Sequence, residues 1–174
     1  MMRGLNLRRL ALMSMLGILA ALANAQAQDG AGIRPNNSSA PATEFRMQAL
    51  RAEPGKPSLY DVRFTTVDTL DARAELVFEF PAALDVSLLE VASSTTINGG
   101  FTITREGNRV RVLRTGLGAT LPPGRQVEVK LGLITSPATL AGNLEVGFSQ
   151  IRASGQPAAA KKNYPIQFVP KPVF

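Results

Sequence analysis

The side chains that perform most enzymatic and metal chemistry are scarce in this sequence. Its 174 residues contain no histidine and no cysteine. Their absence removes Ser-His-Asp and Cys-His catalysis, ordinary zinc sites, and haem or iron–sulfur ligation by these residues. The run Gly116-Leu117-Gly118 leads into Pro122-Pro123 and not into a helix, so it is not a dinucleotide-binding loop. Carboxylates and basic groups remain as candidates.

Glu75 and Glu79 are the first carboxylate candidates, because they project from the same side of an extended segment. Four strand residues separate them by roughly 13 Å, at about 3.3 Å per residue. Glycosidase pairs lie closer, at roughly 5 to 9.5 Å. We therefore expect a solvated outer face and no enzyme. A carboxylate-dependent hydrolase is the third functional hypothesis.

Three aspartates could gather at one end of the fold and bind a cation. Asp68, Asp71 and Asp85 each lie in a stretch that predicts a turn. Calcium takes six to eight oxygen ligands, and no loop here has the dense Asp-x-Asp pattern that supplies them. Ordinary turn chemistry is the alternative. Ca²⁺ is thus a possible ligand, and no other cofactor is expected.

Basic side chains form the most suggestive group. Between residues 105 and 130, six cations face two acids, which gives this stretch a formal charge of +4. Such a concentration attracts anionic lipid headgroups, acidic glycans or an acidic protein. The alternative is a solvated strand face that charge protects from edge-to-edge pairing. The predicted contact residues are Arg105, Arg109, Arg111, Arg114, Arg125 and Lys130.

The candidate carboxylates and basic groups must be positioned by β-strands, and the stretch from Ala74 to Pro81 shows this most clearly. Leu76, Phe78 and Phe80 fall on one side of the extended chain, which is the period of a half-buried β-strand. Glu75 and Glu79 fall on the other side, with Val77 between them. Pro81 ends the strand because proline has no N–H to donate. We place this strand in the middle of an antiparallel sandwich.

The same alternation recurs along the chain and predicts an all-β fold, a two-sheet antiparallel β-sandwich of about nine short strands. Gly107-Asn108 predicts a two-residue hairpin turn that sets Glu106 opposite Arg109 and Ile103 opposite Val112. The Gly- and Pro-rich segment 115–125 is long for a hairpin connection, so we expect it to cross between the sheets.

Three finer predictions concern strand phase and position. Every second residue from Val127 to Leu133 is apolar, which predicts one inward face. Ile151 has the opposite parity to the apolar residues before it, which predicts a β-bulge at Ser149-Gln150. Pro165 predicts that the last strand lies at an edge of its sheet.

Residues 1–27 have the pattern of a signal peptide. Arg3, Arg8 and Arg9 precede a short apolar run, and small residues predict cleavage before Gln26 or Gln28. The run is shorter than the about 20 residues of a comfortable membrane span, so an uncleaved anchor is the less favoured alternative and no span is expected after cleavage.

The rest of the chain divides into three parts. Residues 28–43 are rich in Gly, Ala, Pro, Asn and Ser and have no apolar period, which predicts a flexible leader. Residues 44–170 form the predicted sandwich, and 171–174 form a tail. An exported domain without disulfides is more typical of the bacterial envelope than of animal secretion, so we expect a periplasmic or extracellular location in bacteria.

Net charge does not indicate nucleic-acid binding. The chain has 19 Lys and Arg against 13 Asp and Glu, a charge of +6, and three of the arginines lie in the signal. The mature chain therefore has 16 − 13, or +3. Nucleic-acid binding requires stronger clustering of positive charge on one face, so no nucleic-acid partner is expected.

From Leu59 to Ile151 the sequence resembles a β-sandwich module of bacterial surface and envelope proteins, cohesin-like or carbohydrate-binding-like in outline. The matching runs are Y-D-V-R-F-T-T (60–66), L-V-F-E-F-P-A-A-L-D (76–85), G-G-F-T-I (99–103), the Gly107-Asn108 turn, L-P-P-G-R-Q-V-E-V (121–129) and L-I-T-S-P (133–137). The resemblance implies an extracytoplasmic binding or structural module and assigns no catalytic residue.

The leading functional hypothesis is an exported, non-enzymatic binding or structural module. Its partner would be a protein or an anionic envelope component that meets the basic hairpin at residues 101–114. The runner-up is a calcium- or glycan-binding adhesion module. The sequence leaves the partner's identity and the oligomeric state open.

Overall fold

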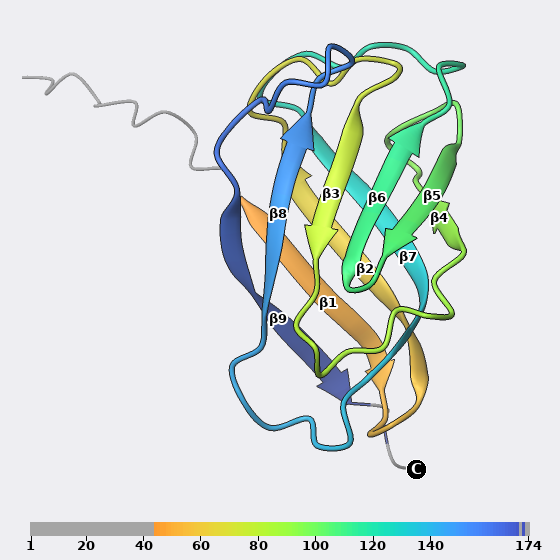
Figure 1. Cartoon of the computed structure of the whole chain (residues 1–174), viewed down its shortest axis with the longest axis vertical. Helices are drawn as coiled ribbons and strands as arrows, with labels where there is room; N and C mark the ends of the chain where they lie inside the picture. The colour runs from red at the N-terminus through yellow and green to blue at the C-terminus, as the bar shows by residue number, and fades with distance from the viewer. Residues whose placement is uncertain (1–43, 171, 173–174) are drawn as a thin grey trace, which may run out of the picture. The chain divides into compact units, whose positions relative to one another are not determined.

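The structure, a computed structural model, describes residues 44–170 and 172. This part of the chain contains nine β-strands, and none of its residues forms a helix that could cross a membrane (Figure 1). The predicted signal peptide (1–27), the leader (28–43) and most of the predicted tail (171–174) lie outside the described residues. The strands are β1 (Phe45–Ala52), β2 (Pro57–Thr65), β3 (Glu75–Glu79), β4 (Val91–Ser93), β5 (Phe101–Glu106), β6 (Arg109–Arg114), β7 (Gln126–Thr135), β8 (Glu145–Ile151) and β9 (Lys162–Pro170).

The strands form one mixed sheet that folds over into two facing layers (Figure 1). Their order is β4-β7-β2-β1-β9-β8-β3-β6-β5. β4, β7, β2 and β1 make one layer, and β8, β3, β6 and β5 make the other. The two outermost strands, β4 and β5, lie close together, so the sheet is nearly closed. The predicted all-β sandwich class is confirmed.

β9 joins the two layers. It pairs antiparallel with β8 up to Pro165 and parallel with β1 from Ile166 onward. The prediction that Pro165 marks an edge strand is therefore wrong. Proline fits here because the strand changes partners at this residue, so its missing N–H falls at the switch between the two ladders. The parallel β1–β9 pair is also a departure from the purely antiparallel sandwich that the sequence predicts.

The strand predicted around Phe78 is β3, and it lies between β8 and β6. Leu76 and Phe78 are buried in the core, as the alternation predicts. Glu75 and Glu79 lie on the outward parity and are partly exposed. The position of this strand in the middle of its layer is confirmed.

The hairpin of β5 and β6 forms in the predicted register. Glu106 lies opposite Arg109, and Ile103 lies opposite Val112. Gly107 in the turn has a φ of 59°, in the left-handed region that glycine adopts without a Cβ clash. The segment 115–125 then leads from β6 in one layer to β7 in the other, so the predicted crossing is also confirmed.

Two predicted details of strand phase are wrong. β8 pairs with β3 without a register shift, so no bulge occurs at Ser149-Gln150. Gln150 is buried on the inner face, and its amide donates to a backbone carbonyl at 3.3 Å. In β7 the alternation breaks at Leu133, which is 51% exposed. The β2–β7 register shifts there, so Leu133 is the extra residue of a bulge.

The core lies between the layers and has an aromatic centre. Phe148 of β8 packs against Phe45, Phe64 and Phe78, with ring centroids 4.8, 4.9 and 5.3 Å away. These separations fall in the range of favourable ring pairs. Phe45 and Phe64 belong to β1 and β2, so this cluster connects the two layers.

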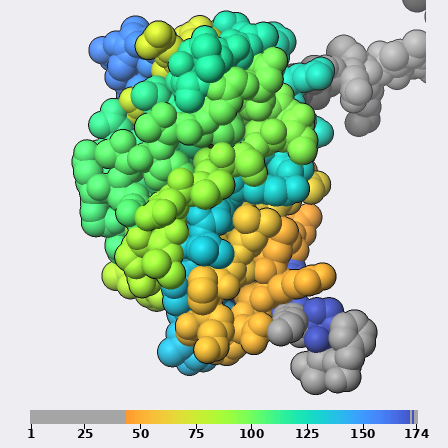
Figure 2. Space-filling model, turned by 90° about the vertical axis from the view of Figure 1, so that its right-hand side faces the viewer, coloured from red at the N-terminus to blue at the C-terminus, as the bar shows by residue number. Residues whose placement is uncertain are grey.

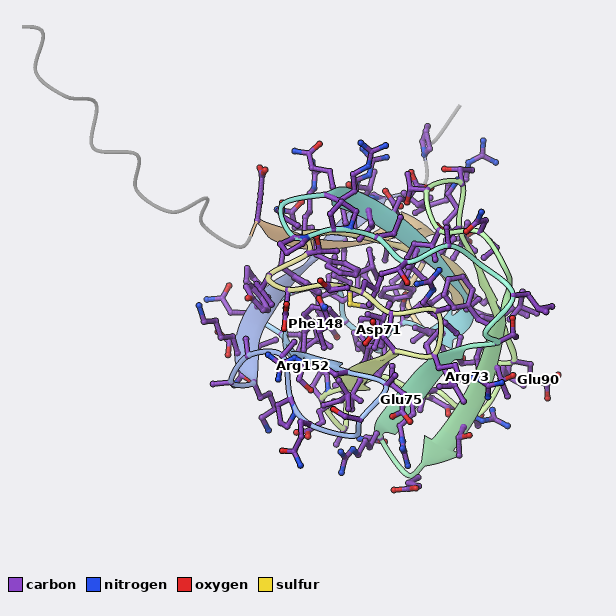
Figure 3. All side chains as sticks on the ribbon, turned by 90° about the horizontal axis from the view of Figure 1, so that it is seen from above. Asp71, Arg73, Glu75, Glu90, Phe148 and Arg152 are labelled. Atoms are coloured by element: carbon purple, nitrogen blue, oxygen red, sulfur yellow. The ribbon has the colours of Figure 1, made fainter. Side chains whose placement is uncertain are left out.

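The end of the sandwich at which β3 begins is built from tightly packed loops, and we call it the loop end (residues 66–74, 98–100, 115–125 and 152–158). Figure 3 looks down on it. A Cβ at Gly118 would lie 2.0 Å from the carbonyl oxygen of Asn98, so glycine is required there. The Ala119 amide donates to the Asn98 side chain at 3.0 Å. These contacts join two of the loops into one unit.

Candidate functional site

The outward surface of β8, β3, β6 and β5, which we call the hairpin face, holds the predicted functional hairpin. Figure 1 views this layer face on, and no other strand passes in front of it. Two of the six predicted basic residues, Arg109 and Arg111, lie on its outward parity. Across the strands, Arg109 lies between Glu79 and Glu106 in register.

Arg111 is held by Glu75 of the neighbouring strand. Its Nε donates to Glu75 Oε2 at 3.0 Å, and its Nη2 lies 2.8 Å from Oε1. This two-point contact fixes the guanidinium plane. The hydrogen bonds, and then the charge of Glu75, raise the pKa of Arg111 above its ordinary value. Arg111 is therefore a fixed part of the face.

Arg109 differs from Arg111 because no described carboxylate forms an ion pair with it. Its neighbour Glu79 is bound instead by Lys161, with Nζ 2.5 Å from Oε2. Across β3 and its neighbours the face is charge-balanced, because it has three cations and three carboxylates. They are Arg109, Arg111 and Lys161, and Glu75, Glu79 and Glu106. Neither Glu75 nor Glu79 is a free carboxylate of the kind that glycoside hydrolysis uses.

The other predicted basic residues do not join this face. Arg105 donates through Nη1 to the carbonyls of Val86 and Ser87 in a turn beside the hairpin. Arg125 lies in the loop before β7. Lys130 lies on β7 in the opposite layer, where its Nζ is 3.1 Å from Glu128.

Arg114 lies inside the protein and is 1% exposed. Its guanidinium donates to the carbonyls of Leu70 and Asp71 at 2.7 Å each and of Ala119 at 2.6 Å. Burial lowers the pKa of Arg114, and the nearby Asp71 charge opposes this shift. The side chain connects loops of the loop end and is unavailable to a partner. Strand parity indicates this burial, because Arg114 is two residues after the buried Val112 on β6 and therefore lies on the same inward face.

The three predicted metal ligands are not brought together. Asp85 pairs with Thr135 at the end of β7, whereas the bridge between Leu70 and Leu121 lies before its start. The length of β7, ten residues or about 33 Å, therefore separates Asp85 from Asp68 and Asp71. Among residues 44–170 and 172, no three acidic side chains gather as a metal site. Calcium binding stays a prediction that this geometry does not support.

Asp68 and Asp85 instead stabilise turns. Asp68 accepts from the Thr69 amide at 2.7 Å and from Arg152 at 2.6 Å, and these bonds lower its pKa (Figure 3 labels Arg152). Asp85 accepts from the Ser87 amide at 2.8 Å, which lowers its pKa in the same way. Both carboxylates are thus favoured in their charged form.

These shifts predict a specific acid sensitivity. Because the folded-state pKa of Asp68 is lowered, its stabilising effect is present above the unfolded value of about 3.9 and is lost as pH falls through the folded value. The variant Asp68→Asn, which cannot ionise, should therefore show a shallower loss of stability below about pH 4. Urea midpoints from pH 7 to pH 2 measure this. Parallel curves for both proteins would contradict it.

A groove that the sequence did not indicate lies where β1 begins, β2 ends and β7 begins. Its volume is about 350 Å³. Arg63 donates to Asp61 at 2.9 Å, and Arg46 donates to Gln167 at 3.0 Å. Alternating strand polarity hides such a groove, because each strand alone looks like an ordinary solvated face. Its polar lining residues are Glu44, Arg46, Arg63, Thr65, Thr96, Gln126 and Glu128.

Comparison with known proteins gives a likeness of fold. No family model matches the sequence, and no curated protein matches it. Among solved structures, similar ones include a non-cellulosomal cohesin from Archaeoglobus fulgidus (TM-score 0.42, 16% identity, 71% of this chain and 91% of that one). Others are a cohesin module of a Clostridium perfringens family 33 glycoside hydrolase (0.42, 17%, 74% and 100%) and the collagen-binding subdomain of the Enterococcus faecalis surface protein ACE (0.41, 8%, 71% and 94%). These solved structures are similar to the protein in the outline of the fold.

Proposed function

We propose that the protein is an exported, non-catalytic binding module of the bacterial envelope or cell exterior that binds its partner through the hairpin face. The observation that supports this most is an open, charge-balanced sheet face in which Arg109 has no ion-pair partner among the described residues. The N-terminal signal pattern and the absence of cysteine support export and a disulfide-free fold.

The hairpin face has the properties of a recognition surface. Arg111 is fixed by Glu75, so little conformational freedom is lost when a partner approaches it. Arg109 presents an unpaired guanidinium, which can form a two-point contact with a partner's carboxylate. Beside Arg111, in register on β3 and β8, lie the short side chains of Val77 and Ser149. An acidic protein segment or another anionic envelope component fits this arrangement.

A non-catalytic role agrees with the chemistry of the chain. It has no histidine and no cysteine. The two glutamates of β3 are neutralised by Arg111 and Lys161, so no pair of carboxylates on this face is available as acid and base. Binding is the activity that these side chains support.

The variant Arg109→Glu tests this proposal. We expect it to abolish capture of the partner in a crosslinking pull-down from a native envelope extract, because a carboxylate on the partner would meet a like charge. Capture by the unchanged protein should weaken when salt is raised from 50 to 500 mM, because the Debye length becomes roughly threefold shorter. Arg109→Glu sets a third carboxylate between Glu79 and Glu106, so its melting temperature should fall slightly. Arg109→Gln, which only removes the charge of an exposed and unpaired side chain, should weaken capture and keep the melting temperature.

Arg125→Glu is the matched control, because Arg125 is also exposed but lies in the loop before β7. A charge-swapped variant, Glu75→Arg with Arg111→Glu, keeps the ion pair while reversing its polarity. Equal capture by Arg109→Glu and by Arg125→Glu would refute the hairpin face as the contact surface.

A further inference from the structure

The outward surface of the opposite layer, formed by β4, β7, β2 and β1, has a row of apolar positions in register. Val91 pairs with Gly132, Gly132 pairs with Leu59, and Leu59 pairs with Leu50. Residues directly opposite each other in a sheet share a face. The row therefore crosses four strands, and we call this surface the β7 face. Figure 2 looks onto the side where β4 (lime), β7 (cyan) and the β1–β2 hairpin (orange) meet.

These apolar side chains are exposed to solvent. Val91 is 63% and Leu59 is 39% exposed. The bulge in β7 adds Leu133 beside them, 51% exposed. The Leu59 side chain leans over Gly132, since its Cδ1 lies 3.3 Å from the position that a Cβ would take there. The row is thus a continuous aliphatic strip and not a set of isolated residues, and strips of this kind mark contact sites.

The remainder of the β7 face is charge-balanced. The row next to the strip pairs Lys130 with Asp61, and the one beyond it pairs Glu128 with Arg63. Arg46 on β1 and Glu44 just before that strand add one charge of each sign. Three cations and three carboxylates therefore alternate here. A copy turned about a two-fold axis that runs between β2 and β7, parallel to them, would set Lys130 against Asp61 and Glu128 against Arg63, so that opposite charges meet.

The size of the face also fits self-association. Strands about 4.8 Å apart make four strands roughly 20 Å wide, and the nine residues of β2 are about 30 Å long. Because β4 has only three residues, the footprint is at most about 600 Å² for each copy, or about 1,200 Å² in total, at the lower end of specific interfaces. An area of this size is consistent with a reversible dimer and not with a permanent one.

We propose that the β7 face binds a second copy of this chain, with the aliphatic strips of the two copies packed together about a two-fold axis. The occupant is a second copy because the charge pattern matches itself, whereas a strongly acidic or basic partner would meet as many like charges as opposite ones. The hairpin face stays free in this dimer, because it belongs to the other layer. The dimer would therefore present two hairpin faces.

Sedimentation equilibrium of the protein, purified as the cell processes it, tests the proposal between about 1 and 500 µM, the range suited to a weak interface. We expect a reversible monomer–dimer equilibrium. Leu133→Lys should weaken dimerisation about tenfold or more, because it places a charge in the centre of the strip. Leu117→Lys is the matched control: Leu117 is 86% exposed but lies at the loop end. It should dimerise like the unchanged protein.

Crosslinking identifies the face independently of any variant. In a mixture of isotopically light and heavy protein, an amine-reactive reagent should join Lys130 of one copy to Lys130 of the other, because this residue lies one row from the strip. A monomer at every concentration would overturn the proposal. So would a dimer that Leu133→Lys and Leu117→Lys affect equally, or one in which Lys130 forms no link between copies. None of these outcomes depends on the proposed role of Arg109.

Discussion

Replacing Arg114 with methionine is expected to lower the free energy of unfolding by about 3 to 5 kcal/mol, because three buried carbonyls lose a donor. The guanidinium donates to carbonyls of Leu70, Asp71 and Ala119, and methionine can donate to none of them. Each buried carbonyl left without a donor costs about 1 to 3 kcal/mol. Some of the cost is offset, because the Leu70 carbonyl also accepts from the Leu121 amide. Urea unfolding followed by circular dichroism measures the change.

Two further variants show whether the hydrogen bonds of Arg114 are the cause. Arg114→Lys keeps the charge, but a compact ammonium cannot reach carbonyls on separate loops as a planar guanidinium does, so we expect an intermediate loss. Arg125→Met removes an exposed arginine of the same loop end and should leave the urea midpoint unchanged. If Arg114→Met were as stable as Arg125→Met, the buried side chain would not be holding the loops together.

Replacing Phe148 with alanine is expected to cost about 3 to 5 kcal/mol, the range for truncating a buried aromatic ring. Phe148 contacts rings from both layers, with centroids 4.9 Å from Phe64 of β2 and 5.3 Å from Phe78 of β3. Its removal would leave a cavity at the centre of the core and would also delete these ring pairs, worth about 0.5 to 1.5 kcal/mol each. Thermal and urea unfolding should both report the loss.

Phe148→Leu separates the two contributions. Leucine fills much of the cavity but has no ring, so we expect it to recover most of the transfer and cavity energy and to retain the loss of the ring pairs. Phe148→Leu should then lie between the unchanged protein and Phe148→Ala. Equal destabilisation by both substitutions would argue that the ring geometry, and not the filled volume, stabilises the core.

The parts of the fold that could be predicted are those in which local pattern and tertiary structure agree. The alternation around Phe78 gave the position of β3, because a half-buried strand shows its two faces in its own residues. The Gly107-Asn108 turn gave the hairpin register, because a two-residue loop fixes every pair behind it. Neither inference needed information from distant residues.

The errors arose where a distant segment decides the role of a residue. Pro165 looked like an edge residue, but its strand changes partners there, which the strand itself cannot show. Strand parity predicts a bulge at Gln150 because a polar side chain is expected to face solvent, yet its amide is buried and donates to a carbonyl of the loop before β3. The same expectation places Arg114 on the surface, although it is buried.

The candidate site was predicted in part for a similar reason. Arg109 and Arg111 share a face because they are two residues apart on one strand. Charge counted along the sequence grouped them with Arg105, Arg125 and Lys130, although the fold places these on other surfaces. The neutralising partners Glu75 and Lys161 come from other strands or loops, so the balance of charge on the face could not be counted from the hairpin alone.

The double pairing of β9 has a consequence for the order in which the protein can assemble. A chain that emerges N-terminus first presents all eight earlier strands before Lys162 appears. Until then β1 and β8 each have an open edge, because the strand that pairs with both of them is missing. The pairing of Met47 with Ile166 can form only after β9 is available, and contacts between residues so far apart in sequence form slowly. The nascent protein therefore stays incomplete, and open to β-pairing with other chains, until its final strand has been delivered.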